Sequence, residues 1–162
     1  HNAVFGGMDE NGIPRHAHKK STASGSALRI NVEGSDPAYS FHYLSKNPYP
    51  HRLFVFEAPI DLLSYISLHP DNWKQHSYVA LCGVSEKPVL KLLERYPQLD
   101  RMVLCLDNDE AGLNAASRIH KILQQKDFEN VEYDISAHKD WNEELVKTVC
   151  SQEQSELAIA MK

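Results

Sequence analysis

The stretch Arg101-Met-Val-Leu-Cys-Leu-Asp107-Asn-Asp109-Glu-Ala-Gly112 constrains the fold most, because an apolar run leads directly into two carboxylates. A strand this apolar is expected to be buried on both faces, as in a parallel sheet covered by helices. Open α/β sheets bind their ligands at the carboxyl ends of such strands. Two acids at that edge repel each other and lose hydration, so we expect a divalent metal to offset them. Mg2+ in particular binds one or two carboxylates together with water or phosphate.

The length of 162 residues and the hydrophobic content of 42% are typical of one globular domain, or of one domain with a small appendage. No apolar run is long enough to cross a membrane, and the start at His1 lacks the features of a signal peptide. We therefore expect no membrane partner. The missing initiator Met suggests a fragment of a larger polypeptide or a processed chain. The three cysteines form no paired pattern, which favours a reducing, cytoplasmic location.

Charge is distributed unevenly along the chain. Residues 1–56 carry six Lys and Arg against four Asp and Glu, a balance of +2, whereas residues 57–162 carry eleven against eighteen, a balance of −7. The acidic part cannot bind phosphate by simple charge attraction, so any phosphate contact there requires a bound cation. At the basic end, Arg15, Lys19 and Lys20 are candidates for contact with a nucleic-acid backbone.

His16 and His18 alternate along one predicted strand and therefore share a face. Two histidines without further ligands make an incomplete metal site. We favour a basic surface strand over a metal site for this segment.

The pattern of strands and helices changes at Asn47–Pro50. Residues 1–50 are predicted to form a small β-rich segment with a hairpin turn at Asn11-Gly12. Residues 51–150 alternate strands with helices, which predicts an α/β fold with a parallel four-stranded sheet and flanking helices. Residues 151–162 are expected to extend the last helix or to form a tail. The predicted strands cover residues 3–8, 13–18, 28–32, 39–44, 53–57, 77–82, 102–106 and 130–135, and the predicted helices cover residues 60–68, 88–96, 111–125 and 142–149.

Acidic residues follow three of the predicted parallel strands. Glu57 ends one strand with Asp61 one helical turn beyond it, Asp107 and Asp109 end another, and Asp140 follows a third. Each aspartate alone is more readily explained as a helix cap. Glu57 needs a partner, because it closes the apolar run Leu53–Phe56. Because the ends of parallel strands meet at one edge, the acids together favour a site for one or two metal ions.

Two acidic motifs resemble those of the Toprim family. Phe56–Asp61 resembles its glutamate motif, and Leu104–Gly112 resembles its Asp-x-Asp motif with the Ala-Gly that opens the next helix. Lys139–Leu145 is similar to the Lys-Asp-Pro-Asp-Glu segment of bacterial primases. Residues 53 to about 145 carry the Toprim resemblance. Gly6–Tyr43 also resembles the β-rich segment that precedes the Toprim core in primase-like proteins of plasmids and integrative elements.

The resemblance implies a site that uses Mg2+ or Mn2+ to make or break phosphodiester bonds. It implies that Glu57 is the general acid/base, that Asp107 and Asp109 hold the metal, and that Asp61 and Asp140 support them. Lys139 and Asn142 are expected as supporting residues. Asn142 stands where primases have a second Asp, which removes one negative charge. Ala58-Pro59 replaces the Gly-Tyr common in primases and alters the turn.

The function implied by the resemblance is primase-like nucleotidyl transfer in DNA replication or mobilisation. The expected partners are DNA or RNA, nucleoside triphosphates, and helicase or zinc-binding domains of a larger polypeptide in the bacterial cytoplasm. Two alternatives stay open, namely a Toprim nuclease and a non-catalytic module that binds nucleic acid or recruits partners. A phosphoacceptor receiver domain is disfavoured, because receivers take their acidic pair from the first strand of the sheet.

Overall fold

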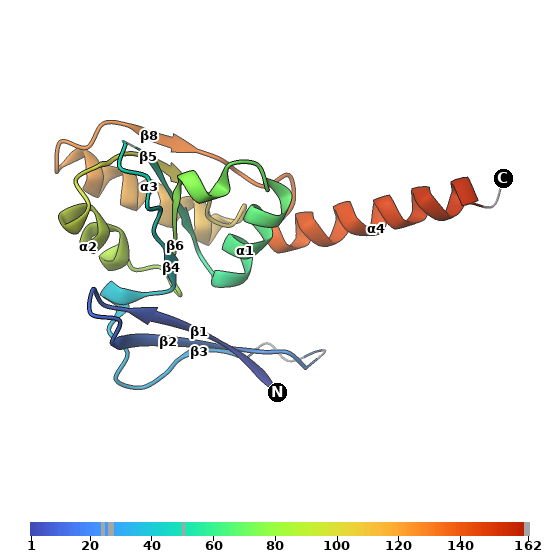
Figure 1. The fold of residues 1–162 in the computed structure, drawn as a ribbon, viewed down its shortest axis with the longest axis horizontal. Coiled ribbons are helices and arrows are strands. Elements are labelled where there is room, and N and C mark those ends of the chain that lie inside the picture. Colours follow the sequence, from blue (N-terminus) through green and yellow to red (C-terminus); the bar gives the residue numbers. More distant parts are fainter. Residues whose placement is uncertain (24, 26–27, 50, 161–162) are drawn as a thin grey trace.

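The computed structural model describes residues 1–23, 25, 28–49 and 51–160, and for residues 157–160 it describes the backbone alone. These residues form a five-stranded sheet covered by helices and a three-stranded sheet beneath it (Figure 1). The last helix extends away from both sheets (Figure 1). Pro50, at the predicted boundary, and residues 161–162, at the end of the predicted tail, lie outside the described residues.

The larger sheet has the strand order β4-β6-β5-β7-β8. Four of its strands run parallel, namely β5 (His51–Phe56), β6 (Ser77–Ala80), β7 (Leu99–Leu104) and β8 (Val131–Tyr133). They are the four strands predicted from the alternating pattern, so the parallel sheet is confirmed. The fifth strand, β4 (His42–Tyr43), pairs antiparallel with β6 at the edge. This strand was predicted within the β-rich segment, and its joining the parallel sheet was not foreseen.

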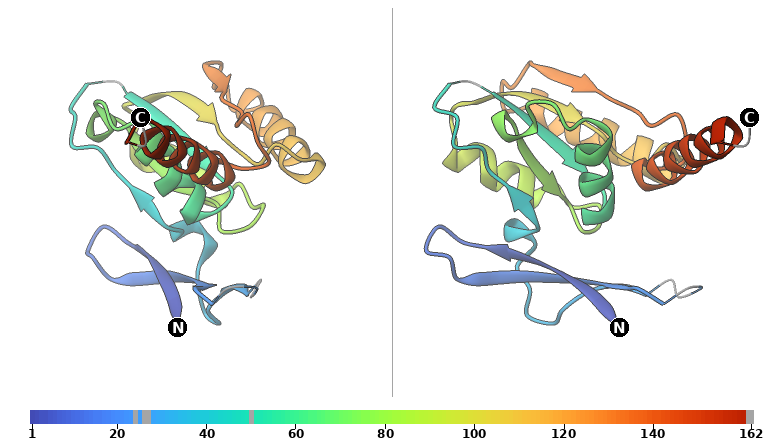
Figure 2. Two further views of the ribbon diagram at one scale, coloured as in Figure 1. Left: turned by 90° about the vertical axis from the view of Figure 1, so that its right-hand side faces the viewer. Right: turned by 45° about the vertical axis from the view of Figure 1, so that its right-hand side comes forward.

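Helices cover both faces of this sheet (Figure 2). On one face, α2 (Lys87–Arg95) and α3 (Glu110–Gln124) pack against the alternate residues Leu53 and Val55 of β5. On the other face, α1 (Pro59–Leu68) and the start of α4 (Trp141–Ala160) pack against Phe54 and Phe56. The central strand β5 is therefore buried on both sides, as the apolar run predicts.

The three-stranded sheet consists of β1 (Asn2–Met8), β2 (Pro14–Ser21) and β3 (Arg29–Asn31), paired antiparallel in that order. The predicted hairpin turn joins β1 to β2, and Gly12 there has a φ of 75°, which glycine adopts without strain.

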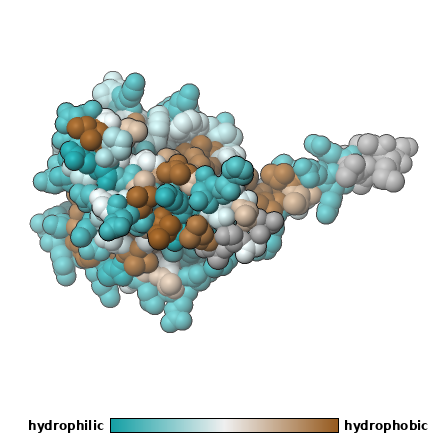
Figure 3. Space-filling model, turned by 90° about the horizontal axis from the view of Figure 1, so that it is seen from below, coloured by the Kyte–Doolittle hydropathy of each residue, from teal (hydrophilic) through white to brown (hydrophobic). Residues whose placement is uncertain are grey.

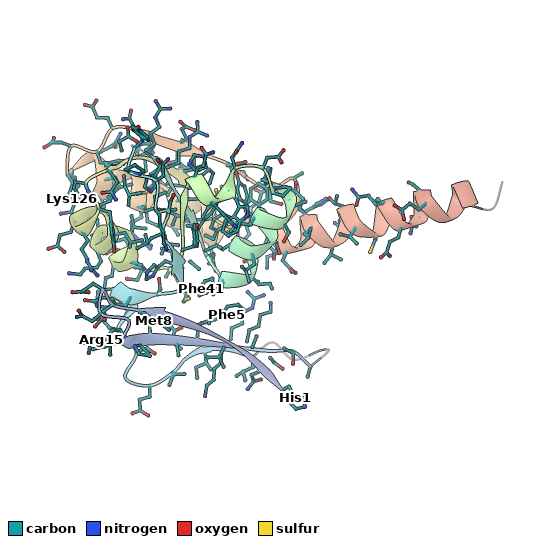
Figure 4. All side chains as sticks on the ribbon, viewed as in Figure 1. His1, Phe5, Met8, Arg15, Phe41 and Lys126 are labelled. Atoms are coloured by element: carbon teal, nitrogen blue, oxygen red, sulfur yellow. The ribbon has the colours of Figure 1, made fainter. Side chains whose placement is uncertain are left out.

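Several contacts join this sheet to the larger body. Phe5 packs edge-on against Phe41 at 5.4 Å between ring centroids (Figure 4). The amide of Asn31 donates a hydrogen bond to the carbonyl of Cys82, just beyond β6 (3.0 Å). Gly7 lies so close to the backbone of Tyr39 that a Cβ would overlap it. The two sheets are therefore held in a defined arrangement.

His16 and His18 do not lie on the surface, contrary to the prediction of a basic surface strand. Both side chains are buried on the face of β2 that turns toward the larger body. Alternation along the strand then places Lys19 on the opposite face. Exposed apolar residues Val4 and Ile30 flank Lys19 in register on that outer face. Figure 3 views the molecule from this side and shows apolar and hydrophilic residues intermixed.

Two further elements differ from the predicted ones. A 3-10 turn at Pro37–Tyr39, capped by the side chain of Asp36, replaces the start of the strand predicted at residues 39–44. The last helix begins at Trp141 and continues to Ala160, into the segment for which a helical extension or a tail was expected. A second 3-10 turn, at Trp73–Gln75, precedes β6. In the part of the chain that the structure covers, no helix combines the length and apolarity needed to span a bilayer.

Candidate metal centre

The site lies where the order of the parallel strands reverses. From the central strand β5 the chain passes to β6 on one side and then to β7 on the other. In open α/β sheets this reversal opens a crevice at the carboxyl ends of the strands, where ligands bind. Glu57 directly follows β5, and Asp107 comes three residues after the end of β7. Neighbouring strands therefore deliver both carboxylates to the same crevice.

Glu57 is half-buried in this crevice. Burial, together with the negative charges of Asp107, Asp109 and Asp61, raises the pKa of its carboxyl group to about 7. A carboxyl with this pKa exchanges protons near neutral pH, which suits a general acid or base.

Asp107 is the most deeply placed carboxylate of the Asp-x-Asp pair. Its Oδ1 atom is buried and has no hydrogen-bond partner among the described residues. Burial raises its pKa to about 6, with contributions from the charges of Asp140 and Asp109. A Cβ on Gly112 would overlap the backbone of Asp107. The Ala-Gly of the motif therefore has a physical reason, since only glycine lets α3 begin so close to Asp107.

Asp61 lies in the first turn of α1 and is buried. Burial raises its pKa to about 7, assisted by the charges of Asp107 and Asp140, whereas a hydrogen bond from the backbone N–H of Asn142 lowers it. Asn142 thus contacts the acidic residues through its backbone N–H.

Asp109 and Asp140 also have structural roles. Asp109 caps α3 by accepting a hydrogen bond from the N–H of Gly112 (3.0 Å), and Asp140 accepts one from the N–H of Glu143 in the first turn of α4 (2.7 Å). The capping explanation weighed from the sequence therefore holds for these two acids. Lys139 lies beside them, with its Nζ 3.8 Å from Oδ2 of Asp109.

Arg29 is a member of this site that sequence reasoning missed. Its positive charge lowers the pKa of Glu57, Asp61 and Asp107, which places it near all three although it comes from the other sheet. Lys20 is its cross-strand neighbour and shares its face. In the sequence, the only signal for such a residue was the positive charge balance of residues 1–56. That balance does not distinguish Arg29 from the other basic residues of this segment.

The three predicted nucleic-acid contacts are separated by the fold. Lys20 lies on the inner face with Arg29, whereas Lys19 alternates onto the outer face. Arg15 lies at the irregularity near the start of β2 and forms a salt bridge with Asp9 (2.8 Å).

The donor set fits a hard divalent cation. Carboxylate oxygens are the ligands that Mg2+ and Mn2+ prefer, and the crevice supplies them from three elements. The unpartnered Oδ1 of Asp107 is an acceptor that a cation would satisfy. Among the residues that the structure describes, however, no three His, Cys, Asp or Glu side chains already form a cluster that could hold a metal ion. Binding would therefore require side-chain adjustment or water ligands, which Mg2+ commonly retains.

A parallel sheet with acidic residues at its carboxyl edge defines an α/β protein with a carboxylate-rich site suited to a cation. The comparison with family models makes this specific: residues 54–145 match the Toprim-like family, and the chain belongs to it. Residues 1–47 match a second family, described as a protein of unknown function (DUF3991).

Two relatives and two solved structures support the primase resemblance. An uncharacterized, plasmid-encoded protein of Bacillus anthracis is 29% identical over 95% of this chain and 47% of its own length. The DNA primase of Mycoplasma pneumoniae is 28% identical over 67% of this chain and 17% of its own length. The chain thus spans less than half the length of these relatives.

The fold is similar to the primase fragment of the bacteriophage T7 primase-helicase, with a TM-score of 0.69 and 18% identity over 95% of this chain and 62% of that one. It is also similar to the catalytic core of the E. coli primase, with a TM-score of 0.64 and 17% identity over 91% of this chain and 48% of that one. At these levels of sequence identity, the similarity shows the fold alone. The Toprim resemblance drawn from the two acidic motifs is confirmed.

Proposed function

We propose that this chain carries a Mg2+- or Mn2+-dependent site for phosphodiester chemistry and that its reaction is primase-like nucleotidyl transfer. The observation that carries the proposal is the convergence of Glu57, Asp61 and Asp107 at one sheet edge, with raised pKa values and one unpartnered buried oxygen. Such a group of carboxylates lowers the stability of the protein unless a cation compensates it, which argues for a functional role.

The position of each residue indicates its role in the proposed reaction. Asp107 and Asp109 would hold the cation, with Asp61 and Asp140 supporting it. The cation would supply charge stabilisation for the attacking and leaving oxygens at phosphorus. Glu57 takes the proton from the attacking hydroxyl as the new phosphodiester bond forms and pyrophosphate leaves. Its pKa of about 7 matches this task.

The basic residues facing the acids are suited to phosphate. Arg29 and Lys20 lie on the inner face of the three-stranded sheet, and Lys139 lies beside Asp109. Arg and Lys side chains supply most of the affinity for a nucleic-acid backbone. We propose that a nucleic-acid strand or a nucleoside triphosphate lies between this face and the carboxyl edge. A similar DnaG domain has been solved bound to single-stranded DNA, and the T7 primase domains with an RNA/DNA hybrid and dTTP.

The proposed partners follow from the relatives. We propose that the chain acts within a longer polypeptide in the bacterial cytoplasm, since it spans 62% of the T7 primase fragment and less than half of both relatives. Helicase or zinc-binding domains are the proposed neighbours. Within the chain, we propose residues 1–50, 51–150 and 151–162 as the β-rich segment, the Toprim domain and the helical extension.

Primer synthesis on a single-stranded template tests the proposal directly. The protein is incubated with a labelled oligonucleotide template, all four nucleoside triphosphates and Mn2+, and products are separated on a denaturing gel. New products that require triphosphates and disappear in Glu57→Gln support the proposal. If no product forms under any template or nucleotide condition while divalent cations bind, the proposed reaction is wrong.

The same gel assay without triphosphates tests whether the protein is a nuclease instead. Shortening of labelled single- or double-stranded DNA, dependent on Mn2+ and lost in Glu57→Gln, would assign cleavage in place of synthesis. DNA binding that persists in EDTA and in Glu57→Gln, with neither product, would assign the non-catalytic role.

A further inference from the structure

A groove lies between α2 and the segment that follows α3, away from the acidic edge. It has a volume of about 640 Å³ and is lined by residues of α2, of the segment that follows α3 and of the 3-10 turn at Pro37–Tyr39. Figure 4 labels Lys126 at its α3 side, next to α2. The 15 residues of α3 separate Lys126 from the capping Asp109, a length of roughly 20 Å at 1.5 Å per residue. The groove is therefore distinct from the metal centre.

The groove-lining side of α2 combines apolar and cationic residues. Lys87, Leu90, Lys91 and Glu94 follow the spacing i, i+3, i+4 and i+7, and so share one face of the helix. The core face of α2 is formed instead by residues such as Val89. Leu93 of the groove also packs against the core, whereas Lys87, Leu90 and Lys91 do not belong to the core cluster.

The opposite wall of the groove also combines an apolar and a cationic residue. Phe128 provides a half-buried aromatic ring, and Lys126 next to it is exposed. Together with Leu90 and Leu93, Phe128 gives the groove an apolar floor, and the lysines form its rim.

The rim carries more positive charge than its own acids neutralise. Glu94 pairs with Lys91 at 3.2 Å, whereas Lys87 and Lys126 form no ion pair with any residue that the structure describes. These two unpaired ammonium groups above an apolar floor contrast with their surroundings, because residues 57–162 carry a net charge of −7. Charge complementarity therefore favours an anionic occupant with an apolar centre.

We propose that this groove binds an acidic protein segment in which carboxylates flank bulky apolar side chains. The apolar side chains would cover Leu90 and Phe128, and the carboxylates would pair with Lys87 and Lys126. A nucleic-acid strand fits less well, because it presents phosphates along its whole length and would leave the apolar floor without a matching surface. The proposal does not depend on the reaction at the metal centre.

Fluorescence anisotropy with synthetic peptides tests it. The probe is a fluorescein-labelled peptide of sequence Glu-Glu-Leu-Phe-Glu-Glu, and the matched peptide replaces Leu-Phe by Ser-Gly. The variants are Lys126→Glu, the double variant Lys87→Glu/Lys126→Glu, and Lys121→Glu as a control, since Lys121 is exposed on α3 but does not line the groove. Circular dichroism confirms that each variant is folded.

The proposal predicts that Lys126→Glu weakens binding of the first peptide, that the double variant weakens it by at least ~10-fold, and that Lys121→Glu leaves it within about twofold. The Ser-Gly peptide should bind at least ~10-fold more weakly to the unmodified protein.

Four results would overturn the proposal. They are no peptide binding at millimolar concentration, equal losses in Lys126→Glu and Lys121→Glu, equal binding of both peptides, and a groove filled by a second copy of this chain. The last would appear as a dimer in light scattering that Lys126→Glu dissociates. Displacement of the peptide by single-stranded DNA, with DNA binding lost in the double variant, would reassign the groove to nucleic acid.

Discussion

The carboxylate of Asp61 on α1 accepts a hydrogen bond from the backbone N–H of Asn142 at the start of α4, at 3.2 Å. This bond joins residues 81 positions apart at the acidic edge of the sheet. It holds Asp61 in place without neutralising its charge, so the repulsion from Asp107 and Asp140 remains. The acidic group is thus positioned by backbone contacts while its charges stay available to a cation.

Removing one of these charges should stabilise the protein while impairing metal binding. Asp107→Asn keeps the shape of the side chain but removes a buried charge whose Oδ1 has no partner. We expect a gain of about 1 kcal/mol at pH 8 without divalent cations, which corresponds to a Tm increase of roughly 2–4 °C for a chain of this size. Thermal unfolding followed by circular dichroism measures it. Asp71→Asn, at an exposed position, is the control and should leave the Tm unchanged; a lower Tm for Asp107→Asn would contradict the account.

That gain should depend on pH in a defined direction. The folded state raises the pKa of Asp107 from 3.8 to about 6, so it binds the proton more tightly than the unfolded chain does. Stability contributed by this group is therefore fully present below about pH 4 and is lost as the pH rises through about 6. The Tm advantage of Asp107→Asn over the unmodified protein should be largest above pH 7 and shrink toward pH 4. An advantage that grows at low pH would show that the carboxylate is stabilised by the fold.

Gly112 should not tolerate a side chain. A Cβ there would overlap the backbone of Asp107, so Gly112→Ala must shift either the start of α3 or the strand end that carries the acid. We expect a destabilisation of about 1–3 kcal/mol together with weaker metal binding. Gly6→Ala is the matched control, because the nearest atom to its Cβ would be 4.0 Å away. Chemical denaturation of both variants tests this prediction, and equal stabilities would refute the close approach.

The two faces of the three-stranded sheet should differ in nucleic-acid binding. Arg29→Ala and Lys20→Ala remove charges that face the acidic edge, whereas Lys19→Ala removes one from the outer face. We expect each inner-face change to weaken binding of single-stranded DNA in Mn2+ several-fold and to lower the salt dependence by about one unit of slope. Anisotropy titrations at several salt concentrations measure both. A larger effect of Lys19→Ala would place the strand on the outer face.

The strand ends and their acids could be predicted because they depend on local patterns. The apolar runs before Glu57 and Asp107 are unambiguous buried strands, and parallel pairing brings their carboxyl ends together by geometry alone. The family motifs then singled out the acids from other surface carboxylates.

Features that depend on distant packing could not be predicted in the same way. Arg29 is an ordinary exposed arginine in the sequence and reaches the acids only because Asn31 and Phe5 fix one sheet against the other. His16 alternates as a surface residue would, yet its face of the strand is the one that turns inward. The strand that contains β4 was predicted, but its antiparallel pairing with β6 was not, because two paired residues carry no signal for their partner strand.

Calorimetric titration with Mn2+ tests the central claim most directly, because it measures the site without assuming a reaction. Asp109→Asn preserves helix capping, since Asn caps as well as Asp does. The account predicts saturable binding to the unmodified protein at pH 8 and a loss of at least ~10-fold in affinity in Asp107→Asn/Asp109→Asn. Unchanged Mn2+ binding in that double variant would contradict the assignment of the metal centre to this edge of the sheet.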